Sequence, residues 1–242
     1  MLQQSHNGFR IVAQVEYRHT SAFLSTAKNI ISNKCHNCAC LLRRLLRYHR
    51  KYPNREYVIQ KALSYNKTIA QEITTDSVDS SRKILLLEAR AAHLYWEAVE
   101  TLIYSNDDAW KRTYPHAKDP YNIAFNIGYT FLARKIREEI VFSKLMPEIG
   151  IFHIERNNHD PLVYDIMELY RQPVVDSVVV ALFTKKKQAH NALSAVDIAR
   201  LIKKLEQQWE MPVMYNGKCF PIREMVSFEL HHFAICVEQA VP

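Results

Sequence analysis

Apolar positions recur every three or four residues through most of the chain, which is the spacing of one buried helix face. Pro161 in the first turn supports the start of the helix predicted over 161–171, and a cap by Ser194 supports the start of the helix predicted over 194–209. The predicted helices cover residues 20–50, 56–74, 82–104, 122–144, 161–171, 194–209 and 222–238.

Three segments depart from this helical pattern. Residues 149–154 are short and apolar, and fit either a strand or a buried link. Residues 174–183 are rich in valine and favour β structure by propensity, although tertiary context could still make them helical. Asn216-Gly217 predicts the turn of a small hairpin. We therefore expect a mainly α protein, a single multi-helix catalytic domain with at most a small hairpin. Residues 1–20 would be an N-terminal linker-like segment and residues 21–242 the helical domain.

Composition narrows the possible functions. The 242 residues are 48% hydrophobic, which is enough to bury a substantial core. The net charge of +7 favours polyanionic partners, nucleic acid first, although a merely soluble basic protein explains it equally well. Only four glycines occur, and no glycine-rich phosphate loop is present, which argues against nucleotide folds. No apolar run is long enough to span a bilayer, so we expect a cytoplasmic protein without a membrane partner.

Three of the five cysteines lie close together, at Cys35, Cys38 and Cys40. A C-x-x-C pair can form half of a zinc site, but no second pair follows in the sequence. The favoured interpretation is that these are small apolar residues of a helix in a reducing compartment.

Carboxylates on apolar stretches are the candidate chemistry. Asp165 and Glu168 are three residues apart, so they share one face of a predicted helix that is otherwise apolar. Burying such a pair is costly unless a cation meets it. His153 precedes this helix, and Glu88 follows three leucines on another. Carboxylate oxygens with one imidazole suit Mg²⁺ or Mn²⁺, which can polarise a phosphodiester and activate water or a 3′-hydroxyl.

Ordinary charge pairing is the competing interpretation of the same residues. Glu88 would then pair with Arg90 or His93. The two carboxylates of residues 161–171 would pair with Arg171 or serve as caps.

Four stretches of sequence are more informative about function than the individual residues. They are Glu88-Ala-Arg-Ala-Ala-His-Leu-Tyr-Trp96, Asp119-Pro-Tyr-Asn-Ile-Ala-Phe-Asn-Ile-Gly-Tyr-Thr-Phe-Leu132, Pro147-Glu-Ile-Gly-Ile-Phe-His153, and Leu162-Val-Tyr-Asp-Ile-Met-Glu-Leu-Tyr-Arg171 with Val175-Asp176. In order, spacing and chemistry they resemble the catalytic motifs of the CRISPR-associated integrase family, "Cas one". The resemblance extends over roughly residues 10 to 235.

This resemblance implies a role for each candidate residue. Glu88, His153 and Glu168 would be the ligands of a catalytic Mg²⁺ or Mn²⁺, and Asp165 a nearby catalytic acid that supports the site. The implied activity is that of a DNA endonuclease and integrase of CRISPR spacer acquisition, in which water or a DNA 3′-hydroxyl attacks a phosphodiester. The implied partners are double-stranded and branched DNA, a second copy of the chain, and the small "Cas two" protein.

Two departures from the family pattern keep other functions open. The sequence is expected to start at or just after the linker that follows the family's N-terminal β-domain. Ala89 also stands where the family often has glycine. One alternative is therefore a catalytically silent DNA-binding or assembly module with the same helical fold. Another is a helical protein with no nucleic-acid role.

Overall fold

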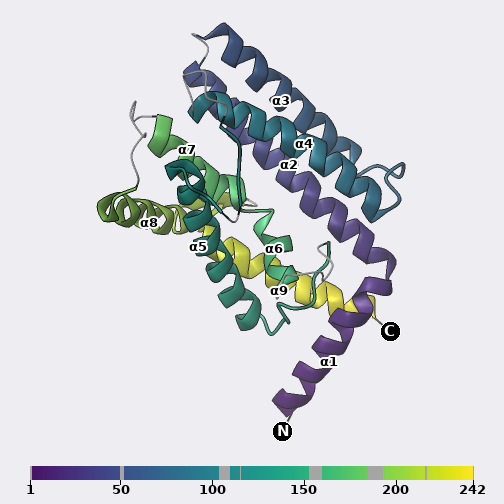
Figure 1. The fold of residues 1–242 in the computed structure, drawn as a ribbon. Coiled ribbons are helices and arrows are strands. Elements are labelled where there is room, and N and C mark those ends of the chain that lie inside the picture. Colours follow the sequence, from purple (N-terminus) through teal and green to yellow (C-terminus); the bar gives the residue numbers. More distant parts are fainter. Residues whose placement is uncertain are drawn as a thin grey trace.

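The computed structural model describes most of the chain, and helices dominate it (Figure 1). The described residues are 2–49, 52–103, 110–114, 116–152, 160–184, 193–215 and 217–241. Strands occur within these ranges only as one antiparallel hairpin. The same part of the chain contains no helix that is both long and apolar enough to cross a bilayer. The predicted fold class, mainly α with a small hairpin, is confirmed.

Three long helices lie side by side, and they carry several residues of the site described below. They are α2 (Ser21–His49), α3 (Pro53–Glu72) and α4 (Ser81–Ile103), with mutual contacts among all three (Figure 1). The fixed φ of Pro53 suits a first helical turn, so α3 begins at this residue and not at residue 56 as predicted.

The remaining helices pack around one central member, α5 (Pro120–Phe142). Its neighbours are α6 (Pro161–Met167), α7 (Ser177–Thr184), α8 (Ala195–Trp209) and α9 (Ile222–Ala240). Helix α5 starts where Asp119 accepts a hydrogen bond of 2.8 Å from the backbone N–H of Asn122. Helix α8 starts with a full capping box between Ser194 and Asp197, which confirms the predicted cap.

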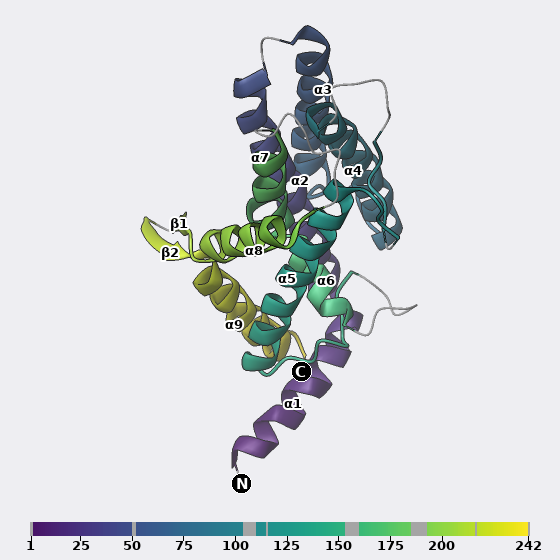
Figure 2. The ribbon, with the colours of Figure 1, turned by 60° about the vertical axis from the view of Figure 1, so that its left-hand side comes forward.

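The predicted hairpin is present. Strands β1 (Pro212–Tyr215) and β2 (Lys218–Pro221) pair antiparallel, with Tyr215 opposite Lys218. Gly217 has φ of 76°, the left-handed conformation that such a tight turn requires. The hairpin projects beyond α8 and α9 (Figure 2).

The β propensity of residues 174–183 is overridden. A π-helix, η2 (Arg171–Asp176), continues directly into α7, so the described part of this segment is helical throughout. Elements α2, α4, α5 and α8 pack against η2 or α7, and Val174, Val175 and Val179 are completely buried. A fully buried helix is apolar on every side, so its sequence cannot be distinguished from a buried strand by periodicity.

Glycine is required at one helix contact in this region. A Cβ at Gly128 on α5 would overlap Cγ1 of Val175. Only glycine therefore lets α5 come this close to η2. This approach brings side chains of α5, η2 and α4 together near Glu88.

The segment before α2 is also helical. It consists of α1 (Leu2–Glu16) and a 3₁₀ turn, η1 (Tyr17–His19); the N-terminal end of α1 projects from the other helices (Figure 1), whereas its C-terminal part packs against α9. Arg10 forms an ion pair of 2.6 Å with Glu238 of α9. The boundary predicted between residues 20 and 21 falls at the start of α2, and the division into linker and domain stays a prediction.

Candidate active site

Two carboxylates from distant parts of the sequence meet on one cation. Glu88 lies on α4 and Glu168 follows directly after α6. The ammonium nitrogen of Lys34, on α2, is 2.5 Å from Oε1 of Glu88 and 2.7 Å from Oε2 of Glu168. Both carboxylates are therefore within direct bonding distance of a single positively charged atom.

These three side chains are largely removed from solvent. The exposed fractions are 12% for the side chain of Lys34, 18% for Glu88 and 4% for Glu168. Burial alone would lower the pKa of Lys34, but the carboxylates of Glu168 and Glu88 outweigh it, and the pKa is raised. Lys34 consequently carries its charge at neutral pH.

A second cation contacts one of the two carboxylates, that of Glu168. Arg171, the first residue of η2, lies 3.2 Å from Oε1 of Glu168. The pairing of Glu168 with Arg171 that sequence spacing offered as an alternative is thus present. Glu88 does not use the partners proposed for it, because its carboxylate bonds to Lys34.

Asp165 performs a different task from the other acids. It is completely buried, and its Oδ2 accepts hydrogen bonds from the backbone N–H groups of Ile151 (2.5 Å) and Phe152 (3.0 Å). These bonds hold the buried link 149–152, which leads directly to His153. His153 itself lies outside the described residues.

The described chain that resumes at residue 160 is held as well. Arg137 of α5 forms an ion pair of 2.8 Å with Asp160, and the backbone N–H of Leu162 donates to the carbonyl of Pro147. The chain is therefore fixed just before residue 153 and just after residue 159. The supporting role of Asp165 in catalysis stays a prediction.

The buried carboxylate of Asp176 links the elements that surround the site. Asp176 of η2 accepts hydrogen bonds of 2.6 Å from the hydroxyls of both Tyr95 and Tyr129. Burial raises the pKa of Asp176 to about 6, against the opposing effect of the two hydroxyls and of the nearby guanidinium groups of Arg171 and Arg112. These contacts tie α4, α5 and η2 together.

Arg112 explains the asparagines of the Asp119–Leu132 motif. Its guanidinium donates to Oδ1 of Asn122 (2.8 Å) and to Oδ1 of Asn126 (2.6 Å). It also lies 5.4 Å from the ring centre of Tyr129, within cation–π range. The residues at these motif positions therefore hold the segment before α5 against the helix.

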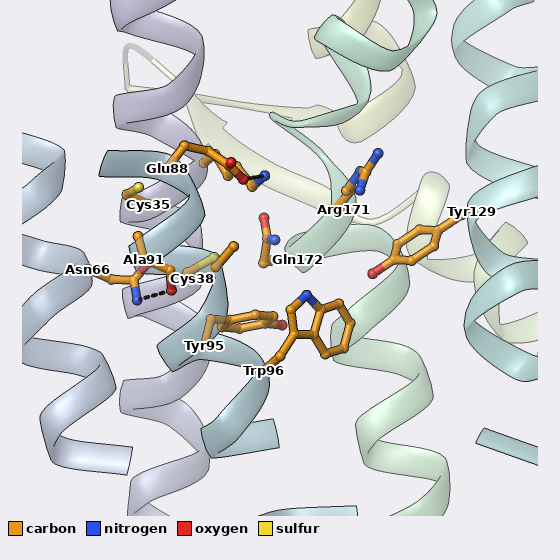
Figure 3. A pocket seen from close by; sticks show the side chains of 12 residues that line it. Cys35, Cys38, Asn66, Glu88, Ala91, Tyr95, Trp96, Tyr129, Arg171 and Gln172 are labelled. Carbon is orange, nitrogen blue, oxygen red and sulfur yellow. Dashed lines mark hydrogen bonds and ion pairs between the residues drawn. The ribbon is translucent and has the colours of Figure 1, made fainter. Parts of the chain in front are cut away.

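A small cavity of about 30 Å³, with several polar side chains in its lining, lies between Glu88 and the buried tyrosines Tyr95 and Tyr129 (Figure 3). Its lining includes Lys34, Glu88, Asn66 and Gln172. Oδ1 of Asn66 and Oε1 of Gln172 are buried and have no hydrogen-bond partner among the described residues. The cavity can hold a polar group about as large as one water molecule.

Sequence reasoning did not identify Lys34 or Arg112. For Lys34 a signal existed, since it lies four residues after Ile30 and four before Cys38, on the buried face of its helix. A lysine among apolar positions at helical spacing indicates a buried partner. Cys35 and Cys38 are themselves buried core residues of α2, as the favoured interpretation predicted, whereas Cys40 is exposed.

The described residues alone contain two of the three predicted metal ligands. Glu88 and Glu168 converge, but no group of three His, Cys, Asp or Glu side chains placed to hold an ion occurs within the described ranges. Asp165 is directed at the backbone and not at this pair. The third predicted ligand, His153, lies outside the described residues.

Comparison with known proteins identifies the family. The family model described as CRISPR-associated protein Cas1 matches residues 1–204. A Cas1 endonuclease of Pyrobaculum aerophilum is 32% identical over 170 residues, covering 70% of this chain and 53% of that protein. A Cas1 endonuclease of Saccharolobus solfataricus is 33% identical over 165 residues, covering 64% and 42%. A Cas4 exonuclease–Cas1 endonuclease fusion of Leptospira interrogans is 29% identical, covering 67% and 30%. The chain thus spans about half or less of these relatives' lengths.

Solved structures agree in fold. A Cas1 protein from Thermotoga maritima superposes with a TM-score of 0.74 at 21% identity, covering 96% of this chain and 72% of that one. A casposase bound to its integration product gives a TM-score of 0.75 at 21% identity, covering 96% and 65%. A chain of a Cas6-RT-Cas1–Cas2 complex gives 0.77 at 20% identity, covering 95% and 25%. With the family model matching most of its length, this chain belongs to the CRISPR-associated Cas1 family.

Proposed function

We propose that this chain carries the catalytic site of a metal-dependent DNA endonuclease and integrase that acts in CRISPR spacer acquisition. The observation that carries the proposal is the convergence of Glu88 and Glu168 on a single cationic atom. Relatives with related sequences are named as Cas1 endonucleases, which supports the same activity.

The residues present fit a hard divalent cation. Two carboxylates from separate elements supply oxygen ligands, which Mg²⁺ and Mn²⁺ prefer. The positive charge of Lys34 between them shows that the pair already stabilises a cation at this position. Glu88, His153 and Glu168 would hold the metal ion, which would polarise the phosphodiester and lower the pKa of a bound nucleophile.

The chain's own residues have separable tasks in this reaction. Glu88 and Glu168 provide negative charge, and Arg171 fixes the orientation of Glu168 through its second oxygen. Asp165 positions the backbone that precedes His153. Water or a DNA 3′-hydroxyl forms the new bond to phosphorus, and the bond to the departing 3′-oxygen breaks.

The proposed partners are DNA, in duplex and branched form, a second copy of the chain, and a small Cas2-type protein. Two solved structures with the same fold are titled as Cas6-RT-Cas1–Cas2 complexes, which supports the last of these. The net charge of +7 is consistent with a polyanionic substrate.

The direct test is DNA cleavage and strand transfer by the purified chain, on duplex and branched substrates. We expect product with Mn²⁺ or Mg²⁺ and none with EDTA, because the site needs a divalent cation. A folded protein that is inert on every substrate with either metal would contradict the proposal and favour the silent DNA-binding or assembly module.

DNA binding should also depend strongly on salt. Each phosphate neutralised by lysine or arginine releases a counterion, so affinity is expected to fall by a factor of about ten or more between 50 and 200 mM salt. Fluorescence anisotropy with labelled duplex in EDTA measures binding without cleavage. Binding that does not change with salt would argue against phosphate contact by this basic chain.

A further inference from the structure

We infer that Lys34 is a built-in counter-ion that occupies the metal position, and that a divalent cation displaces its ammonium toward the polar cavity beside it. The inference rests on the proposed function and adds to it a control of metal loading. It concerns a residue that none of the catalytic motifs contains.

The first argument is charge balance. Among the described side chains, two cations, Lys34 and Arg171, contact the two carboxylates Glu88 and Glu168. The charges of these four described side chains therefore cancel without a metal ion. A divalent ion adds two positive charges within a few ångströms of Lys34, in surroundings where water screens poorly. Both cannot stay on the same carboxylate oxygens.

The second argument is the place available to the displaced group. Lys34 lines the cavity of about 30 Å³ together with Asn66 and Gln172. The side chain of Asn66 is fully buried and that of Gln172 nearly so, and each has an amide oxygen without a hydrogen-bond partner among the described residues. An ammonium group needs acceptors, and these two amide oxygens belong to side chains that line the same cavity as Lys34.

The third argument concerns the remaining cation. Arg171 bonds to the other oxygen of Glu168 from the first turn of η2, so it can stay in place when Lys34 moves. Metal entry then exchanges one cation for another at Glu88 and Glu168, while their orientation is kept. The expected consequence is weak metal binding until Lys34 is displaced.

The test measures Mn²⁺ binding to the full chain by isothermal titration calorimetry, without DNA. Lys34→Met removes the competing charge and should bind Mn²⁺ about ten-fold or more tightly than the wild type. Lys34→Arg keeps the charge and should not gain affinity. Lys28→Met is the matched control on the same helix, since Lys28 bonds only to the carbonyl of Thr75 in the described structure, and it should bind like the wild type.

A second variant tests the cavity. Gln172→Met removes one hydrogen-bond acceptor from the cavity at similar side-chain volume. It should weaken Mn²⁺ binding several-fold when Lys34 is present, and it should have no effect on Mn²⁺ binding when combined with Lys34→Met. An equal loss in both backgrounds would show that the cavity does not receive the ammonium. Lys34→Gln replaces Lys34→Met if circular dichroism shows that the methionine variant is unfolded.

The outcomes separate this inference from the proposed function. Equal Mn²⁺ affinity in the wild type and in Lys34→Met overturns the counter-ion role and leaves the metal site standing. If neither protein binds Mn²⁺ more than Glu168→Gln does, the metal site and the proposed function both fail.

Discussion

Glu168→Gln is expected to lower the rate of DNA cleavage by a factor of about a thousand or more. The change removes a carboxylate that the metal and the transition state share, an interaction of several kcal/mol. Glu88→Gln and His153→Ala should show losses of similar size. Asp165→Ala should be less severe, because Asp165 acts through the backbone of residues 151 and 152. Single-turnover cleavage with saturating Mn²⁺ measures the effect.

The choice of glutamine follows from the structure. Glu168 is the partner of two cations, Lys34 and Arg171, so alanine would leave buried positive charge and cost about 3–5 kcal/mol of stability. Glutamine removes the same negative charge, but it keeps the volume and one acceptor oxygen for the two cations, so the fold is disturbed less. Glu210→Gln, in an exposed pair with Arg223, is the control and should cleave normally. Full activity of His153→Ala would show that the third ligand is assigned wrongly.

Asp176→Ala is expected to have the largest effect on stability, lowering the free energy of unfolding by about 3–5 kcal/mol. It leaves the hydroxyls of Tyr95 and Tyr129 buried without this acceptor, and it removes a carboxylate that interacts with the nearby guanidinium groups of Arg171 and Arg112. Urea unfolding followed by circular dichroism measures the change. A decrease of less than about 1 kcal/mol in the free energy of unfolding would mean that the contact of Asp176 with Tyr95 and Tyr129 contributes little to stability.

The same residue predicts a pH dependence. The pKa of Asp176 is raised from 3.8 to about 6, so the folded state favours the protonated form. Its contribution to stability is complete below pH 3.8 and is lost as pH rises through about 6. Asp176→Asn, which resembles the protonated acid, should lack this slope. The difference in unfolding free energy between wild type and Asp176→Asn over that range isolates the effect.

Local signals in the sequence predicted most of the fold. Helical spacing located the long helices, and the Ser194 cap and the turn at Gly217 were found where local chemistry determines the backbone. Prediction failed where tertiary contacts decide. The helix predicted over 161–171 ends at Met167, and the valine-rich run after it is helical because helices surround it.

The candidate site was predicted only in part for a similar reason. Glu88 and Glu168 could be named from their apolar surroundings and from the family motifs, and the structure brings them together. Their shared partner, Lys34, lies 54 residues before Glu88, and no local pattern connects the two. Asp165 likewise gave no indication that it would bond to backbone N–H groups of another segment.

The π-helix η2 makes chain length, and not only residue identity, a constraint on this protein. A π-helical turn contains about one residue more than an α-helical turn, so η2 corresponds to an α-helix with a single-residue insertion. Arg171 and Gln172 line the cavity from its first turn, and Asp176 reaches the tyrosines from its last. Deleting one residue between them would rotate Asp176 by about 100° relative to Arg171. Across Cas1 sequences, insertions and deletions should therefore be rarer between positions 171 and 176 than substitutions at Pro173 or Val174.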